Sequence, residues 1–297
     1  MLTKPMLIGF ACAIAATILW SGNFIVARGL SEVIAPLSLA FWRWVVAILV
    51  LLPFAIKPLL AQKAWLKKHL GYLSIVSLLG VTLFNSLIYL AGQTSSAINL
   101  SLIAITFPIF ILILSRVFLS EIIGWNKLFG IALVAAGILL LISKGDLLIF
   151  SQLSFAQGDI WMLIASLIFA IYSMLLKRKP AGISVPAFQL ASFILGWIFL
   201  LPFYLLERYW LPPQALDQSA VASILYIGVF ASLVAFILWN KAIAIIGAVN
   251  AGMVYYSLPI FSGILLAGLK KKMAVVVAAL LSSSYYAAFH FVKTKTN

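Results

Sequence analysis

Long, continuously apolar runs alternate with short polar segments along this chain. Most runs are about 20 residues long, which is the length that an α-helix needs to cross a bilayer. The strands of a membrane β-barrel would instead alternate apolar and polar residues, so the pattern favours helices. The sequence therefore predicts ten spanning helices, over residues 7–28, 34–56, 70–91, 96–116, 124–143, 159–177, 185–206, 219–240, 247–269 and 273–292.

The second half of the chain repeats the first. Leu51–Phe54 returns as Leu200–Phe203, 149 residues further on, and Pro108–Phe110 returns as Pro259–Phe261. We divide the chain into two five-helix repeats, residues 1–146 and 147–297, of which the second is atypical after residue 269. An odd number of spans makes the two repeats enter the membrane from opposite sides. The predicted fold class is therefore an all-α polytopic membrane protein with ten transmembrane helices in two inverted repeats. Inverted repeats are typical of transporters whose substrate site lies between the halves.

Composition excludes a soluble domain. Of the 297 residues, 65% are hydrophobic and 9% are charged, whereas a soluble domain carries about 25% charged residues. The net charge of +14 arises from 20 lysines and arginines in short clusters between apolar runs, which is how a polytopic protein fixes its orientation and argues against nucleic-acid binding. We expect a multi-pass protein of the cell (inner) membrane with both termini in the cytoplasm. Lys270–Lys272 would then lie outside and is discordant.

The chain is poorly supplied for catalysis. Its six acidic residues fall at predicted helix ends or in loops, and its two histidines lie near the predicted interfaces. No nucleophile with a neighbouring base, metal-ligand cluster or phosphate-binding glycine loop is visible. We expect no catalytic residues, no metal and no cofactor, and we predict that the protein is not an enzyme.

Amide and aromatic side chains supply the candidate substrate-binding residues, because an amide in hydrocarbon must find a partner or face water. Trp20 and Asn23 share one helix face, and Asn85 and Tyr89 share another. Hydrogen bonding between helices and an interfacial aromatic belt are the alternative explanations. The candidate set is Trp20, Asn23, Asn85, Tyr89, Trp161, Trp239, Asn240, Tyr255 and Tyr256.

A second set of residues is predicted to serve gating or structure. Arg43 is the charged residue deepest within an apolar run, and it either has a function there or extends its side chain to the outer interface. Pro108 and Pro259 are predicted to kink the fourth and ninth helices. The remaining members are Asn99 and Asn250, expected as helix caps, and Glu121, expected to pair with Arg116 or Lys127 or to cap a helix.

Several of these motifs resemble the EamA-type branch of the drug/metabolite transporter superfamily. The resemblance lies in Ile18–Phe24, in the Arg43-Trp44 pair, in the related Thr106–Pro108 and Ser257–Pro259 segments, and in Phe118–Glu121 followed by Gly130 and Gly137. It implies ten helices in two repeats, cytoplasmic termini and an export function. One position departs from the family pattern, since Lys272 stands where the second repeat would carry an acidic residue.

The expected function is that of a secondary transporter, which exports amino acids or similar small amphipathic metabolites by alternating access through a central cavity between the repeats. A nucleotide-sugar or phosphate carrier of the same superfamily is an alternative, but it would need several buried cations. A membrane-embedded lipid-modifying enzyme is the alternative from another class. The expected partners are a small-molecule metabolite and the lipid bilayer, with the chain as a monomer or weak homodimer.

Overall fold

The computed structural model describes residues 3–30, 32–95, 100, 103–104, 106–120, 124–125, 129–130, 132–133, 136–137, 140, 156–211 and 216–268. Across these residues the regular elements are all helices. They are α1 (Lys4–Gly29), α2 (Pro36–Ala61), α3 (Lys63–Lys68), α4 (Leu70–Ser77), the π-helix η1 (Leu78–Leu83), α5 (Phe84–Thr94), α7 (Thr106–Leu119), α9 (Gln157–Lys177), α10 (Val185–Trp210), α11 (Gln218–Tyr226), the π-helix η3 (Ile227–Val234), α12 (Ala235–Tyr255) and α13 (Leu258–Gly268).

Six helical segments are long and apolar enough to cross a membrane, and α7 adds a shorter apolar helix. They are Lys4–Asn23, Pro36–Ala61, Leu70–Thr94, Gln157–Lys177, Val185–Trp210 and Gln218–Tyr255. The prediction of an all-helical, multi-pass membrane protein is confirmed. The predicted run 124–143 falls largely, and the run 273–292 and the repeat boundary at residue 146 fall entirely, outside the described residues.

The eighth and ninth predicted helices follow one another with only a local break. Helix α12 continues past residue 240 to Gly247, where φ is 79° and ψ is 164°. A side chain would strain that backbone, which suits glycine. A second break at Tyr256 and Ser257 separates α12 from α13. The predicted end at residue 240 was therefore too early, and the predicted helix 247–269 consists of two pieces.

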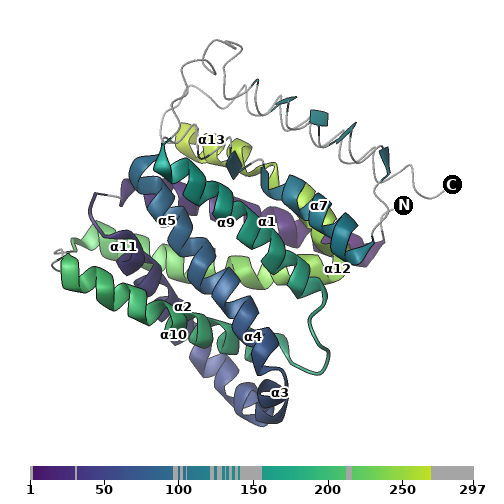
Figure 1. The fold of residues 1–297 in the computed structure, drawn as a ribbon, viewed down its shortest axis with the longest axis horizontal. Coiled ribbons are helices and arrows are strands. Elements are labelled where there is room, and N and C mark those ends of the chain that lie inside the picture. The colour runs from purple at the N-terminus through teal and green to yellow at the C-terminus, as the bar shows by residue number, and fades with distance from the viewer. Residues whose placement is uncertain are drawn as a thin grey trace.

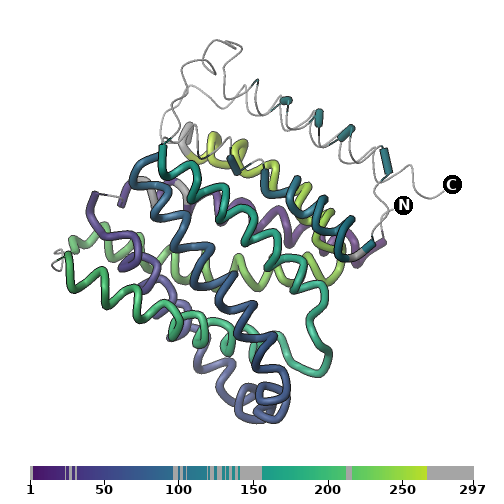
Figure 2. The backbone as a smooth tube through the Cα atoms, in the orientation of Figure 1, coloured from purple at the N-terminus to yellow at the C-terminus, as the bar shows by residue number. Residues whose placement is uncertain are grey.

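The two halves exchange packing partners. Helix α1 of the first half lies along α12 and α13 of the second, and α9 of the second half lies along α5 and α7 of the first (Figure 1). Helices α2 and α10 lie side by side at the lower left of this view (Figure 2). This reciprocal arrangement is the one that inverted repeats produce, and it places the core at the junction of the halves.

A π-helix lies at the same place in the third span of each half. The η1 helix begins at Leu78 and η3 begins at Ile227, 149 residues later. Each contains a glycine at a close contact: Gly80 faces the Tyr172 ring, and a Cβ on Gly228 would lie 2.5 Å from Val46. Short π segments inside an α-helix are frequently found at functional sites, so the pair draws attention to this depth of the bundle.

Helices α2 and α10 cap each other's N-termini. Glu207, near the end of α10, accepts the backbone N–H groups of Leu37 at 2.9 Å and Ser38 at 2.6 Å, and the Ser38 hydroxyl at 2.7 Å. At the opposite end, Gln62 Oε1 accepts the Ser184 N–H at 2.9 Å. The first N–H groups of a helix have no partner within it, so these contacts satisfy both starts and fix the two helices together.

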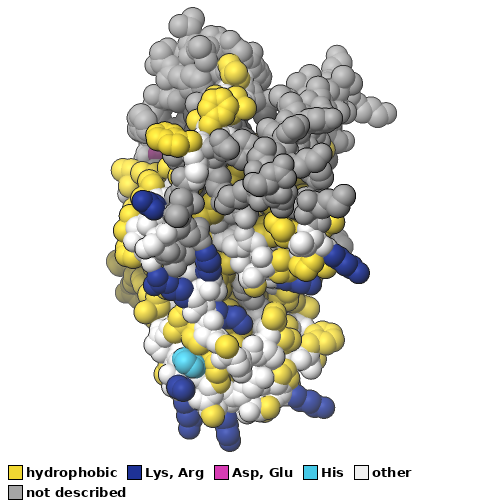
Figure 3. Space-filling view, turned by 90° about the vertical axis from the view of Figure 1, so that its right-hand side faces the viewer, with side chains coloured by type: hydrophobic (Ala, Val, Ile, Leu, Met, Phe, Trp, Pro, Cys, Tyr) yellow, Lys and Arg dark blue, Asp and Glu magenta, His cyan; other side chains and the backbone are white. Residues whose placement is uncertain are grey.

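Basic side chains gather at the end of the bundle that carries α3 (Figure 3). At that end Trp65 Nε1 donates to the Ala181 carbonyl at 2.7 Å, which joins α3 to the loop between α9 and α10. At the other end Asp217 accepts the N–H of Ala220 at 2.8 Å as the cap of α11, and this hydrogen bond lowers the pKa of its carboxyl. The bundle therefore has chemically different ends.

We expect Glu207→Gln to lower the free energy of unfolding by about 1–3 kcal/mol, because an amide presents one acceptor oxygen to donors that a carboxylate binds with two. The measurement is unfolding by dodecyl sulfate in mixed micelles. Glu32→Gln, which changes an exposed carboxylate in the same way, is the control. Equal stability of the two variants would contradict the mutual capping of α2 and α10.

Candidate functional site

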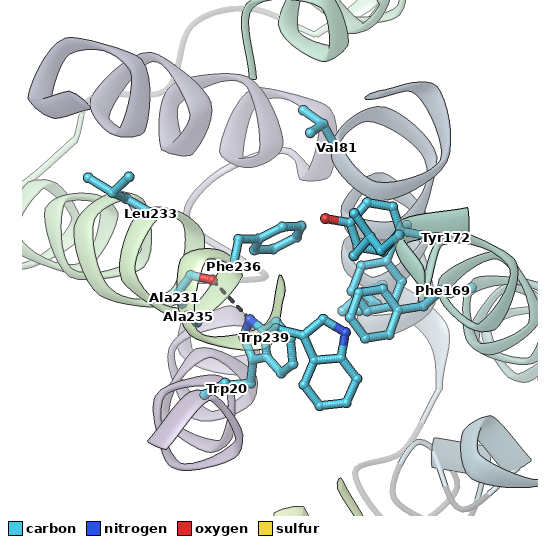
Figure 4. Packing of buried hydrophobic residues seen from close by; sticks show 14 of the residues in the cluster. Trp20, Val81, Phe169, Tyr172, Ala231, Leu233, Ala235, Phe236 and Trp239 are labelled. Carbon is cyan, nitrogen blue, oxygen red and sulfur yellow. Dashed lines mark hydrogen bonds between the residues drawn. The ribbon is translucent and has the colours of Figure 1, made fainter. Parts of the chain in front are cut away.

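An aromatic cluster occupies the junction of the two halves. Trp20 of α1 lies 5.4 Å from Phe169 of α9, and it is 149 residues before it, so the two rings hold equivalent positions in the repeats. Trp239 of α12 lies 5.2 Å from Trp20 and 5.6 Å from Phe169 (Figure 4). Phe236 and Tyr255 complete the contacts around Trp20. The halves therefore meet through rings, which bury large area with little loss of conformational freedom.

The indole N–H groups of this cluster are tied to neighbouring helices. Trp20 Nε1 donates to the carbonyl of Ala231 in η3 at 2.9 Å, across the halves. Trp239 Nε1 donates to Ser173 Oγ at 3.2 Å. Both rings thus have fixed orientations.

Arg43 lies beside the cluster and is fully buried, with 0% of its surface exposed. Its Nε donates to Ser232 Oγ at 2.6 Å, and its Nη1 donates to Asn85 Oδ1 at 2.8 Å and to Tyr89 Oη at 2.5 Å. Tyr89 in turn donates to Asn23 Oδ1 at 3.2 Å. The guanidinium therefore connects α1, α2 and α5 of the first half to η3 of the second.

The two π-helices position the groups that Arg43 contacts. Asn85 Nδ2 donates to the Gly80 carbonyl at 3.1 Å, and Ser232 Oγ donates to the Ile227 carbonyl at 2.9 Å, in each case five residues back. These hydrogen bonds to the local backbone orient both side chains. Each side chain then presents its oxygen to the same guanidinium, and Arg43 bridges the π-helices of the two halves.

No carboxylate of the described residues lies within ion-pair distance of Arg43, and its Nη2 has no hydrogen-bond partner. Its other close neighbours are ring faces, with Cζ at 5.1 Å from the Trp44 ring and 5.6 Å from the Tyr89 ring. Cation–π contacts and neutral oxygens return only part of the free energy lost when a charge leaves water. Arg43 is thus a buried cation whose Nη2 hydrogens have no acceptor among the described residues.

The second half carries a neutral network at the matching place. Tyr172 Oη donates to Asn240 Oδ1 at 3.1 Å, and Asn240 Nδ2 donates to Gln189 Oε1 at 2.8 Å. Tyr172 stands 149 residues after Asn23, and Ser192 stands 149 residues after Arg43. The repeats therefore share an arrangement in which α1, α2 and α5 correspond to α9, α10 and α12, but only the first network is charged.

The structure brings most predicted binding residues to these two networks and the ring cluster. Trp20, Trp239 and Tyr255 lie in the cluster, Asn23, Asn85 and Tyr89 surround Arg43, and Asn240 belongs to the neutral network. Trp161 is half-buried at the edge of the core, and Tyr256 Oη is buried without a hydrogen-bond partner. Arg43 does not reach the outer interface, because its hydrogen bonds hold it inside.

The residues of the predicted gating set have mixed outcomes. Asn250 does not act as a cap acceptor; its Nδ2 donates to the Ile246 carbonyl at 2.8 Å, just before the break at Gly247. Asn99 and Glu121 lie outside the described residues. The described part of the chain contains no group of three His, Cys, Asp or Glu side chains that could hold a metal ion.

The two prolines occupy equivalent helix starts. Pro108 is the third residue of α7, and Pro259 is the second residue of α13. Thr106 Oγ1 donates to the Ile103 carbonyl at 2.6 Å, and Ser257 Oγ donates to the Val254 carbonyl at 2.7 Å, an equivalent contact in each half. The prediction placed Pro259 inside a helix, whereas α13 starts beside it, because the missing N–H of proline is harmless in a first turn.

Several contributors to the site were not predicted. Phe169 could have been found from its 149-residue offset from Trp20. Ser232 and Gln189 carry no signal in the sequence, because a serine or glutamine in a spanning helix more often bonds a neighbouring helix than forms a site.

We expect the double-mutant cycle of Asn85→Ala and Ser232→Ala to show a coupling free energy of about 0.5–3 kcal/mol, since both side chains bond one guanidinium. The measurement is the free energy of unfolding in mixed micelles. The coupling should vanish in an Arg43→Gln background. Asn85→Ala with Ser173→Ala, which bonds Trp239, should be additive. Additivity in the first cycle would contradict the bridge.

The comparisons with known proteins agree with this architecture. One solved crystal structure aligns over 99% of both chains with a TM-score of 0.73 at 18% identity, which shows a shared fold. An uncharacterized transporter of Archaeoglobus fulgidus is 30% identical over 83% of this chain and 84% of its own length. The uncharacterized transporter YyaM of Bacillus subtilis is 24% identical over 88% of this chain and 83% of its own.

The model of one family, described as the EamA-like transporter family, matches residues 7–143 and again residues 156–290. The two matches account for most of the sequence, and they agree with the resemblance found in the motifs. This chain therefore belongs to the EamA-like transporter family.

Proposed function

We propose that this membrane protein is a secondary transporter that exports small amphipathic metabolites, amino acids or similar compounds, by alternating access. One observation carries the proposal: the buried Arg43 network and the ring cluster are built from both halves at the junction between them. Binding sites of repeat transporters lie at such junctions. The rings suit an apolar portion of a substrate, and the amides and the guanidinium suit a polar portion.

Contacts at both ends of the bundle are suited to act as gates. At one end Ser95 bonds the Asp159 carboxylate, and the Gly158 N–H donates to Thr94 Oγ1 at 2.8 Å. At the end that carries α3, Arg178 bonds the Phe118 carbonyl. Opening either end requires breaking its contacts while the other set holds. We propose that the break at Tyr256 and Ser257 beside Pro259 and the first turn of α7 around Pro108 absorb part of this movement, because a helix break bends at little cost.

A nucleotide-sugar or phosphate carrier is a weaker proposal. A phosphate dianion calls for several cations, and Arg43 is the one fully buried lysine or arginine in the described residues.

We also propose that the chain consists of two repeats divided near residue 146 and that it is active as a monomer or weak homodimer.

We expect Trp20→Ala and Tyr89→Ala to lower efflux of radiolabelled amino acids from proteoliposomes by at least tenfold, with the protein still present in the membrane. Trp20→Ala removes a ring of the central cluster, and Tyr89→Ala removes a partner of Arg43. Trp210→Ala, in which the lost ring is 73% exposed, is the matched control. Wild-type rates in both central variants would refute the proposed site.

The proposed orientation places the end that carries α3 in the cytoplasm. Cys12 is the single cysteine and is buried, so a Cys12→Ser background gives clean reporters. A membrane-impermeant maleimide should label Asp217→Cys in intact cells and should label Lys67→Cys only after permeabilisation. The reverse pattern would invert the topology.

A further inference from the structure

The guanidinium of Arg43 has five N–H groups, and three of them are used. Ser232 accepts from Nε, and Asn85 and Tyr89 accept from Nη1. The two hydrogens on Nη2 have no acceptor, although the side chain is fully buried. An unpaired donor in a protein interior costs about 1–3 kcal/mol, and more when it is charged. The site is therefore short of one anionic acceptor.

We propose that the substrate supplies this acceptor, so that Arg43 binds the carboxylate of a monocarboxylate with an apolar or aromatic tail. The inference rests on the proposed function and names the chemical class of its substrate. Charged residues inside membrane spans mark substrate pathways.

The direction of the free donors favours a carboxylate over a phosphate. Because Nε and Nη1 are engaged by Ser232, Asn85 and Tyr89, both two-nitrogen edges of the guanidinium are partly blocked. Nη2 alone can bind a carboxylate oxygen and balance a single negative charge. A phosphate dianion carries two negative charges, and Arg43 would balance only one of them. The described residues contain no other buried cation for the second charge.

The surroundings of Arg43 define the remainder of the ligand. The Trp44 ring lies against the guanidinium and 5.3 Å from the Phe236 ring. Phe236 in turn lies 5.8 Å from Trp20, so Trp44 links the guanidinium to the ring cluster. An apolar tail extending from the carboxylate would meet these rings.

No carboxylate of the described residues faces this cluster. Asp159, the most deeply buried of them, bonds Ser95 and the Ala156 N–H at the start of α9. The described residues of the site thus supply no carboxylate for an ammonium group, so we expect the α-amino group of an amino acid to contribute less to binding than the carboxylate.

Four probes with one phenyl tail test the proposal on the purified wild-type protein. They are 3-phenylpropionate, phenylalanine, 3-phenylpropionamide and phenethylamine, which are an anion, a zwitterion, a neutral amide and a cation. We expect the first two to bind in calorimetry and to raise the melting temperature, and the last two to bind at least tenfold more weakly. Absence of binding by both carboxylates, or tighter binding of the amide or the amine, would overturn the proposal.

Variants then assign the effect to Arg43. Arg43→Gln should raise the Kd of 3-phenylpropionate about ten- to hundredfold, the equivalent of one hydrogen bond to a charged group, and Arg43→Lys should raise it less. Arg116→Gln, which alters an exposed arginine, is the control. Equal Kd values in all three variants would overturn the proposal. If Arg43→Gln does not fold, Arg43→Lys and the wild-type probe series decide.

Binding and flux separate this inference from the proposed function. Arg43-dependent binding without flux in proteoliposomes would leave the carboxylate site standing and refute the transporter proposal. Flux of 3-phenylpropionate at the wild-type rate in Arg43→Gln would refute the site and leave the transporter standing.

Discussion

The arrangement of this protein depends on a charge placed where the described part of the chain offers no counter-charge. Arg43 lies in a spanning helix, fully buried, and three neutral oxygens from both halves hold its guanidinium. A buried cation is expensive, and replacing it with an apolar side chain often stabilises a protein. The surrounding features make sense as a response to that cost: two π-helices aim Asn85 and Ser232 at the charge, and aromatic faces cover it.

The helix arrangement is shared by the two repeats, whereas the polar side chains of the candidate site differ between them. The reciprocal packing of α1 and α9 and the paired π-helices follow the 149-residue offset. The chemistry does not follow it, since Ser192 stands in the place of Arg43 and Phe169 in the place of Trp20. A symmetric pair of buried arginines would repel each other in a low dielectric. One charge with a neutral counterpart gives an oriented site, which can hold one end of an unsymmetric ligand.

Hydrophobic run lengths and the internal repeat were enough to predict the membrane class, the helix order and most spans. These patterns ended the eighth helix too early, at residue 240, whereas the helix breaks at Gly247. The sequence is apolar on both sides of Gly247, and the backbone conformation of this one glycine sets the position of the break. Polar groups in apolar runs are few, so most of the candidate residues named from the sequence do lie together in the structure, and their role in binding stays a prediction. Neither the role of Ser232 nor the unpaired Nη2 group of Arg43 could be predicted. A π-helix rotates every later side chain to a different face of the helix, and it has no signature in composition.

Under the proposed alternating access, the contacts between the halves set what would have to change. Arg43 bonds both halves, so a rocking movement of one half against the other would stretch its hydrogen bond to Ser232, while those to Asn85 and Tyr89 would move with the first half. A ligand bound only at the Nη2 donors would travel with Arg43 and would be held equally in both proposed states, so it would not change the balance between them. Only a ligand that also contacts the second half, for example through the ring cluster, would favour one state over the other.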